Sequence, residues 1–211
     1  MKKIAIQGIK GSYHDVAAQQ YFKGEEIELI CCSTFANVFE QIKKDSSVIA
    51  IVAIENTIAG SLLQNYDLLR ESHTTIVGEH KLRISHSLLC LPEEGWDDIK
   101  EINSHPVALA QCREFLQQHP HIKIVEAEDT AGSAEMISRE HLKGHAAICA
   151  KAVAPLYNMK VLEEGIETNK HNFTRFLVVA DPWQVDELNR HRNKEVNKAS
   201  NNRLFITAQR R

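Results

Sequence analysis

The sequence predicts an α/β fold, in which short buried strands alternate with helices along most of the chain. Two observations indicate this fold. Apolar runs of strand length, such as residues 27–32 and 48–54, are each followed by a stretch with helical spacing of its apolar residues. Small polar loops follow several of these runs, and the carboxyl ends of strands are where open α/β sheets bind ligands.

The first part of the chain alternates strands and helices in regular order. Ser12 with Asp15 three residues later resembles an N-cap with an acidic first turn, and Thr34 is a second candidate cap. Residues 47–54 are almost continuously apolar, which is typical of a strand buried on both faces. We therefore expect strands at 3–8, 27–32 and 47–54, and helices after Ser12, after Thr34 and from Ser61 or Asn65 to Leu69.

The second part repeats the alternation after a longer β-prone segment at 74–91, which Pro92 and Gly95 end. Pro106 suits the first turn of a helix, and Asp129 is a candidate N-cap. We expect a short helix at 96–99, a strand at 101–103, a helix at 107–116, a strand at 122–127, a helix after Asp129, a strand at 145–150, a short helix to Tyr157, a strand at 159–162 and a last strand at 177–180.

Composition limits the classes of protein to consider. The chain has 211 residues, 43% of them apolar and 25% charged, which is enough for one large domain or two small lobes. The net charge of −3 gives no reason to expect nucleic acid binding, and no window is apolar and long enough for a membrane span or a signal peptide core. We therefore expect a cytoplasmic protein.

Metal and disulfide chemistry find no support in the sequence. The five cysteines contain no Cys-x-x-Cys pair, and the eleven histidines contain no His-Glu-x-x-His spacing. Reduced thiols are the expectation, with no metal and no cofactor.

Polar residues at the ends of predicted strands are the candidate ligand-binding groups. Asn56, Ser104 and Thr130 each lie at or near the end of a predicted strand, and Thr174-Arg175 lies where the last strand begins. A guanidinium suits a carboxylate, because it can donate two parallel hydrogen bonds. The alternative is that these residues only cap helices and turn the chain. Asn56 favours the first interpretation, because it follows an acidic residue expected to be buried.

Taken together, these loops resemble the motifs of the prephenate dehydratase family, whose members make phenylpyruvate in phenylalanine synthesis. The resemblance covers roughly residues 3–181, the catalytic domain of that family. Its most specific part is Asn172-x-Thr174-Arg175-Phe176, which is similar to the Thr-Arg-Phe signature. Further motifs match in order, namely Ile54-Glu55-Asn56, Ser104-His105-Pro106-x-Ala108 with Ala110-Gln111-Cys112, and Asp129-Thr130-Ala131.

The sequence departs from the family pattern at a few positions. Ile9 and His14 stand where the family usually has a proline and a hydroxyl residue, Ala53 replaces a usual proline, and Thr57 replaces a serine. These departures bear on fine substrate preference more than on the reaction.

The resemblance implies two α/β lobes like those of type II periplasmic solute-binding proteins, each with a mixed sheet, and a site in the cleft between them. The first lobe is expected at 1–79 plus 176–184 and the second at 80–175, with Thr174 and Arg175 on the return crossing. Residues 185–211 would be a linker and the remnant of an ACT-like domain start. Because that regulatory domain would be absent or cut short, we expect no feedback inhibition by phenylalanine.

The activity that the resemblance implies is the decarboxylating dehydration of prephenate to phenylpyruvate, without a metal or cofactor. Thr174 would donate a hydrogen bond to the leaving hydroxyl, and Arg175 would bind the side-chain carboxylate or orient Thr174. The implied substrate-binding residues are Glu55, Asn56, Ser104, Gln111, Thr130 and Phe176. The family likeness also implies a homo-oligomer, either a dimer or a tetramer.

Two alternatives stay open at this point. The substrate could be arogenate, which has an amino group where prephenate has a keto oxygen. The chain could also be a non-catalytic module that binds a small carboxylate, because one fold hosts many functions.

Overall fold

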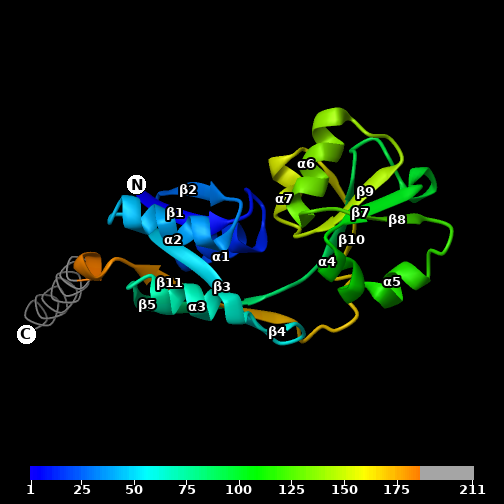
Figure 1. Cartoon of the computed structure of the whole chain (residues 1–211). Helices are drawn as coiled ribbons and strands as arrows, with labels where there is room; N and C mark the ends of the chain where they lie inside the picture. The colour runs from blue at the N-terminus through cyan, green and yellow to red at the C-terminus, as the bar shows by residue number, and fades with distance from the viewer. Residues whose placement is uncertain (186–211) are drawn as a thin grey trace, which may run out of the picture.

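Two sheets organise the chain in the computed structural model, which describes residues 1–185 (Figure 1). In the first sheet β1 runs parallel to β2 and β3, whereas β11 is antiparallel to both β3 and β5. Its strand order is β2-β1-β3-β11-β5, and the short β4 pairs with β3. The strands are β1 (Lys2–Gln7), β2 (Ile27–Cys32), β3 (Ile49–Asn56), β4 (Gly60–Ser61), β5 (Thr75–Arg83) and β11 (Phe173–Ala180).

The second sheet is also mixed. Its order is β10-β6-β9-β7-β8, with β7 parallel to β8 and β9, and β6 antiparallel to β9 and β10. The predicted α/β architecture with two mixed sheets is therefore confirmed. The strands are β6 (Ser87–Cys90), β7 (Glu101–Ser104), β8 (Lys123–Glu126), β9 (His145–Cys149) and β10 (Lys160–Glu164).

Helices cover the sheets, and their caps agree with most of the sequence signals. Ser12, Thr34 and Asp129 each accept a hydrogen bond from a backbone N–H of the following helix. The start of α3 differs from prediction: Leu62 is its N-cap, and the buried Asn65 side chain donates to Ala53 O at 2.7 Å. The helices are α1 (Tyr13–Tyr21), α2 (Phe35–Lys44), α3 (Leu63–Glu71), a 3₁₀ turn (Trp96–Asp98), α4 (Pro106–Gln111), α5 (Arg113–Gln117), α6 (Thr130–Glu140) and α7 (Val153–Leu156).

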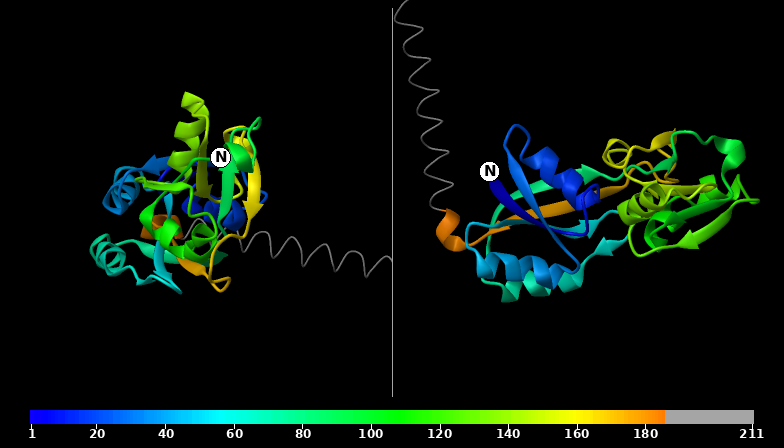
Figure 2. Two further views of the ribbon diagram at one scale, coloured as in Figure 1. Left: turned by 90° about the vertical axis from the view of Figure 1, so that its right-hand side faces the viewer. Right: turned by 90° about the horizontal axis from the view of Figure 1, so that it is seen from above.

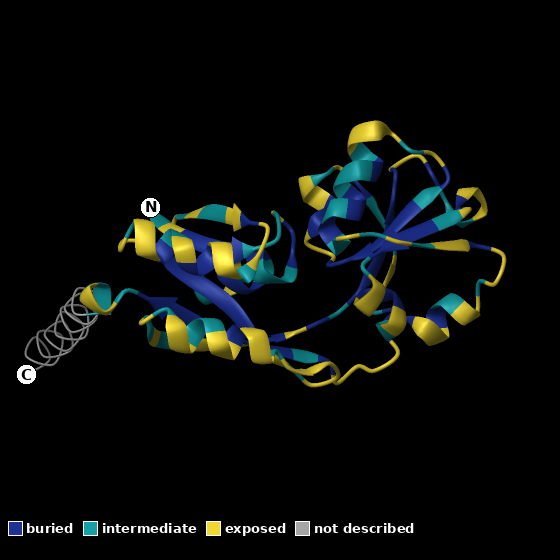
Figure 3. Ribbon diagram, in the orientation of Figure 1, coloured by how far each residue is buried: buried dark blue, intermediate teal, exposed yellow. Residues whose placement is uncertain are grey.

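Strand β3 lies at the centre of the first sheet and is buried on both faces, as its continuous apolar run predicts. Ile51 packs into the cluster under α1, and Val52 packs into the cluster under α2. Figure 3 shows buried residues along the strands and exposed residues on the outer faces of the helices. The polar end of β3 is thus held by an apolar strand on a rigid scaffold.

The chain passes between the two sheets twice, through segments 84–86 and 165–172, here called the crossing segments. We call the part with the first sheet and α1 to α3 the first lobe, and the part with the second sheet and α4 to α7 the second lobe; Figure 2 shows both from two further sides. The crossings differ from the expected division at 79/80 and 175/176. Residues 80–83 and 173–175 belong to the first sheet, because β5 and β11 pair as far as Arg83 and Phe173.

Two further sequence predictions concern the C-terminal residues and the absence of a membrane span. The expected ACT-like remnant at 185–211 lies, from residue 186 on, outside the described residues. Within residues 1–185, no helix is long and apolar enough to cross a membrane.

A buried glutamate joins the two crossing segments. Glu167 has only 1% of its surface exposed, and its carboxylate accepts from His86 N at 2.9 Å and from Ser85 Oγ at 3.4 Å. Arg83 Nη2 lies 3.5 Å away and supplies a positive charge. The segments also pair directly, with Ile84 N donating to Asn172 O at 2.8 Å.

We predict that Glu167→Ala lowers the free energy of unfolding by about 2 kcal/mol, because a buried backbone N–H loses its acceptor. Urea unfolding followed by circular dichroism measures this effect. Glu164→Ala is the matched control, because Glu164 forms an exposed ion pair with Lys151 and should change stability by less than about 1 kcal/mol. Equal effects of the two substitutions would contradict the assigned role of Glu167.

Candidate active site

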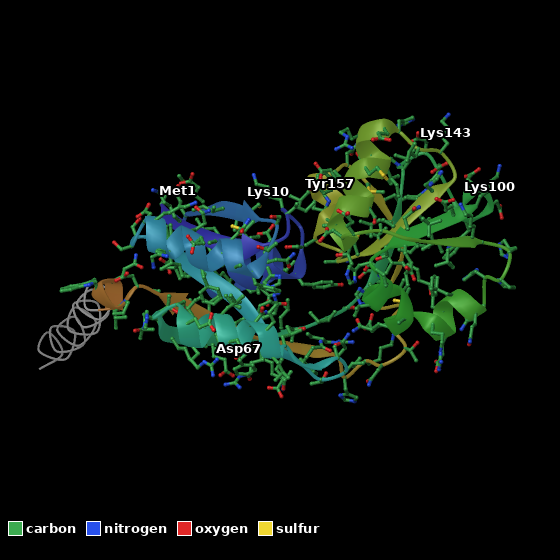
Figure 4. The ribbon with its side chains drawn as sticks, viewed as in Figure 1. Met1, Lys10, Asp67, Lys100, Lys143 and Tyr157 are labelled. Carbon is green, nitrogen blue, oxygen red and sulfur yellow. The ribbon has the colours of Figure 1, made fainter. Side chains whose placement is uncertain are left out.

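A cleft with a volume of about 340 Å³ lies between the lobes and is lined from both sides. Residues from β3, β11 and α1 face it from the first lobe, and residues from α4 and the start of α6 face it from the second. The lobes also make contact at one edge, where Tyr157 Oη donates to Lys10 O at 3.3 Å (Figure 4). The polar lining is formed by Gln7, Ser12, Tyr13, His14, Asn56, His86, His105, Gln111, Glu128, Asp129, Thr130 and Thr174.

Five of the residues singled out in the sequence meet in this cleft, although they come from distant parts of the chain. Asn56 lies at the end of β3, Thr174 and Phe176 lie on β11, and Gln111 and Thr130 come from α4 and α6. The register explains the pairing on the first lobe, because Thr174 lies directly opposite Asn56 in the β3–β11 ladder.

The amide of Asn56 fixes the hydroxyl of Thr174. Asn56 Oδ1 accepts from two backbone donors, Ile58 N at 2.9 Å and Ala59 N at 2.8 Å, which assigns the other amide position as nitrogen. Asn56 Nδ2 then donates to Thr174 Oγ1 at 2.9 Å and to Asn172 Oδ1 at 2.8 Å. Because the oxygen of Thr174 already accepts a hydrogen bond, its O–H is available to donate to a ligand in the cleft.

The same hydrogen-bond network continues across the crossing segments to the second lobe. Asn172 Nδ2 donates to Gln111 Oε1 at 2.9 Å, and His86 Nε2 lies 2.8 Å from that oxygen. Because Oε1 can only accept, Nε2 of His86 carries a proton. On the other side of the ring, Tyr13 Oη lies 2.7 Å from His86 Nδ1.

Burial keeps both members of this last pair uncharged. Desolvation lowers the pKa of His86, against the smaller opposite effects of its Gln111 hydrogen bond and of Glu167. Desolvation also raises the pKa of Tyr13 well above its usual value. Neutral His86 therefore donates from Nε2 and presents an acceptor at Nδ1. Tyr13 keeps its single proton, which has two acceptors within reach, His86 Nδ1 at 2.7 Å and Ser85 O at 2.9 Å. The network from Asn56 to Tyr13 links the two lobes through neutral groups.

Arg175 and Glu55 do not reach the cleft, which corrects the site expected from sequence. Arg175 Nη2 lies 2.7 Å from Glu79 Oε2, and its Nη1 lies 3.9 Å from Glu55 Oε2, in a second groove that the cleft residues do not line. The cause is strand geometry: Thr174 and Phe176 face the cleft, so the residue between them faces away. Glu55 is exposed, so the expectation that it is buried is wrong.

Ser104 does not line the cleft either. Its side chain is fully buried in the second lobe, and Oγ donates to Ile148 O at 2.5 Å. The residue after it, His105, lines the cleft and caps α4 by accepting from Val107 N at 3.2 Å. The hydroxyl of Ser104 therefore holds the end of β7 and is not available to a ligand in this structure.

His14 is a cleft residue that the sequence motifs do not assign. It is the second residue of α1, and its Nε2 accepts from Ala53 N at 3.4 Å. The ring packs edge-on against Phe35 and Phe176, with centroids 5.4 and 5.1 Å apart. Desolvation lowers the pKa of His14 to about 4, so the ring is neutral at pH 7.

The low pKa of His14 predicts a loss of stability on acidification. An unfolded chain binds the proton at a pKa of about 6.5 and the folded chain only at about 4, so stability falls as pH decreases between these values. Because the ring lines an open cleft, we expect a contribution of about 1 kcal/mol between pH 7 and pH 5. Urea unfolding at both pH values measures it. His14→Gln, which cannot bind the proton, should lose less stability than the unmodified chain; equal losses would contradict the prediction.

The cleft lining combines neutral polar groups with two carboxylates, Glu128 and Asp129, which directly precede α6. The lining, within residues 1–185, contains no lysine or arginine side chain. Ser12 and Thr130 bring the N-terminal ends of α1 and α6 to the cleft, and helix N-termini favour negative ligand groups. In the same part of the chain, no cluster of three or more His, Cys, Asp or Glu side chains could hold a metal ion.

The fold and the site define a two-lobed α/β protein whose interlobe cleft presents neutral hydrogen-bond donors to a small molecule. Residues 4–183 match the sequence profile of the family described as prephenate dehydratase. The chain therefore belongs to the prephenate dehydratase family.

Curated relatives carry two names. The chain is 38% identical over 183 residues to the bifunctional chorismate mutase/prephenate dehydratase of Escherichia coli K12, a match that covers 84% of this chain and 47% of that protein. It is 36% identical over 178 residues to arogenate dehydratase 2 of Petunia hybrida, covering 84% of this chain and 44% of that one. The chain thus spans about half the length of the curated relatives that it matches.

Solved structures share the fold. Prephenate dehydratase from Arthrobacter aurescens, solved in complex with L-Phe, has a TM-score of 0.78 at 28% identity, over 85% of this chain and 60% of that one. GqqA, described as a novel type of quorum quenching acylase, has a TM-score of 0.76 at 34% identity, over 85% of this chain and 64% of that one.

The sequence motifs missed three members of the hydrogen-bond network: Tyr13, His86 and Asn172. Asn172 is the first residue of the Thr-Arg-Phe motif and Tyr13 lies between Ser12 and Asp15, but nothing in their spacing gives them a role. His86 lies in the break between β5 and β6, where a lone histidine gives no signal. Only the crossing of the chain brings these residues together.

Proposed function

We propose that this chain catalyses the decarboxylating dehydration of prephenate to phenylpyruvate. The observation that carries the proposal is the Thr174 hydroxyl, whose oxygen accepts from Asn56 and whose proton is available to the cleft. Membership of the prephenate dehydratase family supports the same reaction. A cytoplasmic location and a homo-oligomeric state stay predictions from the sequence.

The hydroxyl addresses the difficult part of the reaction. Prephenate loses its ring carboxylate as carbon dioxide, the electrons of that bond form the aromatic ring, and the ring hydroxyl leaves. Hydroxide is a poor leaving group, so a hydrogen bond that strengthens as the C–O bond breaks lowers the barrier. Threonine is a weak acid, and its contribution is therefore that of a positioned donor in a cleft from which water is excluded when substrate binds.

The absence of lysine and arginine from the described cleft lining suits this chemistry. A strong cation on the departing carboxylate would stabilise the ground state more than the transition state, in which that charge is being lost. Neutral donors such as Gln111 and Thr130 can orient the carboxylates without that cost. The proposed substrate-binding residues are therefore Asn56, Gln111, Thr130 and Phe176, whereas Arg175 does not line the cleft.

Removal of the hydroxyl should lower turnover without changing the fold. Thr174→Val preserves the shape of the side chain, and we expect kcat to fall by roughly 10²-fold or more. The measurement is the rate of phenylpyruvate formation from prephenate, followed by its ultraviolet absorbance in alkali. Arg175→Met is the control from the adjacent position, because that side chain faces the opposite side of the sheet; it should retain turnover within a few-fold. A Thr174→Val variant with near-normal turnover would refute the proposal.

Two other activities can be tested with the same purified protein. Arogenate is the alternative substrate, because similar relatives such as that of Petunia hybrida are named arogenate dehydratase, and side-by-side kinetics distinguish it from prephenate.

The solved structure described as an acylase suggests a second alternative activity, hydrolysis of an acyl-amide bond. Among the described residues, no serine, threonine or cysteine side chain is hydrogen-bonded to a histidine ring, so the activated nucleophile of that chemistry lacks support.

A further inference from the structure

One ring nitrogen of His14 carries a hydrogen-bond donor that has no partner among the described residues. The His14 ring lines the cleft on the same wall as Ala53, Phe176 and Thr174. The ring is held on two sides by Phe35 and Phe176 and at one nitrogen by the backbone of β3. The imidazole is therefore positioned, and its second nitrogen decides what it can bind.

The backbone contact sets the tautomer of His14. Ala53 N–H can only donate, so Nε2 of His14 is an acceptor without a proton, and Nδ1 of the neutral ring carries it. Within residues 1–185, Nδ1 makes no hydrogen bond. Nδ1 also keeps some solvent-accessible surface, because the fully buried side-chain polar atoms without a partner in that part of the chain are Glu94 Oε2 and Gln184 Oε1. The ring itself lines the cleft.

The contact that sets the tautomer depends on the residue at position 53. A proline at that position would have no N–H to donate, whereas Ala53 donates its N–H to His14 Nε2. The pair of Ala53 and His14 therefore places the donor at Nδ1.

We propose that His14 is a substrate-binding residue whose Nδ1–H donates a hydrogen bond to a carboxylate or carbonyl oxygen of the bound substrate. The inference rests on the proposed function and adds a contact to it. A group that can only donate, such as an ammonium, would leave this N–H without a partner and is disfavoured at the same place. His14 thereby selects an oxygen acceptor at its end of the cleft.

Two substitutions separate this role from a structural one. His14→Gln places an amide oxygen near the Nε2 position, where it can accept from Ala53 N–H, but it leaves no donor near Nδ1. His14→Asn places its amide near Nδ1, where the NH₂ can donate, but it does not reach Ala53. The proposal predicts that KM for prephenate rises about 10-fold more in His14→Gln than in His14→Asn, with smaller differences in kcat. Equal KM values, or the reverse order, would overturn it.

A second measurement does not depend on activity. The ¹⁵N chemical shifts of the His14 ring at pH 7 identify the protonated nitrogen, and we expect Nδ1–H; an Nε2–H tautomer would overturn the inference. The two proposals also fail differently. A wild-type chain without prephenate turnover removes the proposed function and this inference with it. An active wild-type chain with the reverse order of KM values removes the inference alone.

Discussion

The hydrogen bond from Asn56 Nδ2 to Thr174 Oγ1 is the interaction on which the site depends. Its direction is set by the two backbone N–H groups that hold Asn56 Oδ1. That direction makes the threonine a donor towards the cleft. The pair is positioned by the antiparallel register of β3 and β11, and β3 is buried on both faces. A central apolar strand thus fixes the orientation of one hydroxyl.

The network that begins at this pair also links the two lobes. It runs through Asn172 on a crossing segment to Gln111 on α4 and His86 on the other crossing segment, and it ends at Tyr13 on α1. Buried polar networks impose a unique arrangement when every member is paired. The relative position of the lobes at the cleft is therefore coupled to the same groups that orient Thr174. Glu167 supports this region from the crossing segments.

Sequence patterns predicted the fold well, because strands such as β3 and caps such as Ser12 and Asp129 are local signals. The placement of Asn56 and Thr174 at one site came from the family resemblance and not from the strand patterns; in the structure the two side chains are hydrogen-bonded. The patterns failed where the direction of a side chain decides whether the residue reaches the cleft. Arg175 is adjacent to Thr174 in sequence but faces the other side of the sheet, where it pairs with Glu79. The hydroxyl of Ser104 donates to a backbone carbonyl inside the second lobe. Long-range contacts such as His86 with Gln111 have no local signal.

The account is tested most directly by the turnover of prephenate in an Asn56→Asp variant. The carboxylate can still accept from the two backbone N–H groups, but it has no N–H to donate to Thr174, whose hydroxyl then turns to donate to it. We predict that kcat falls by roughly 10²-fold while circular dichroism and urea unfolding show an intact fold. A folded variant whose kcat stays within a few-fold of the wild-type value would contradict the claim that Asn56 orients the reacting hydroxyl.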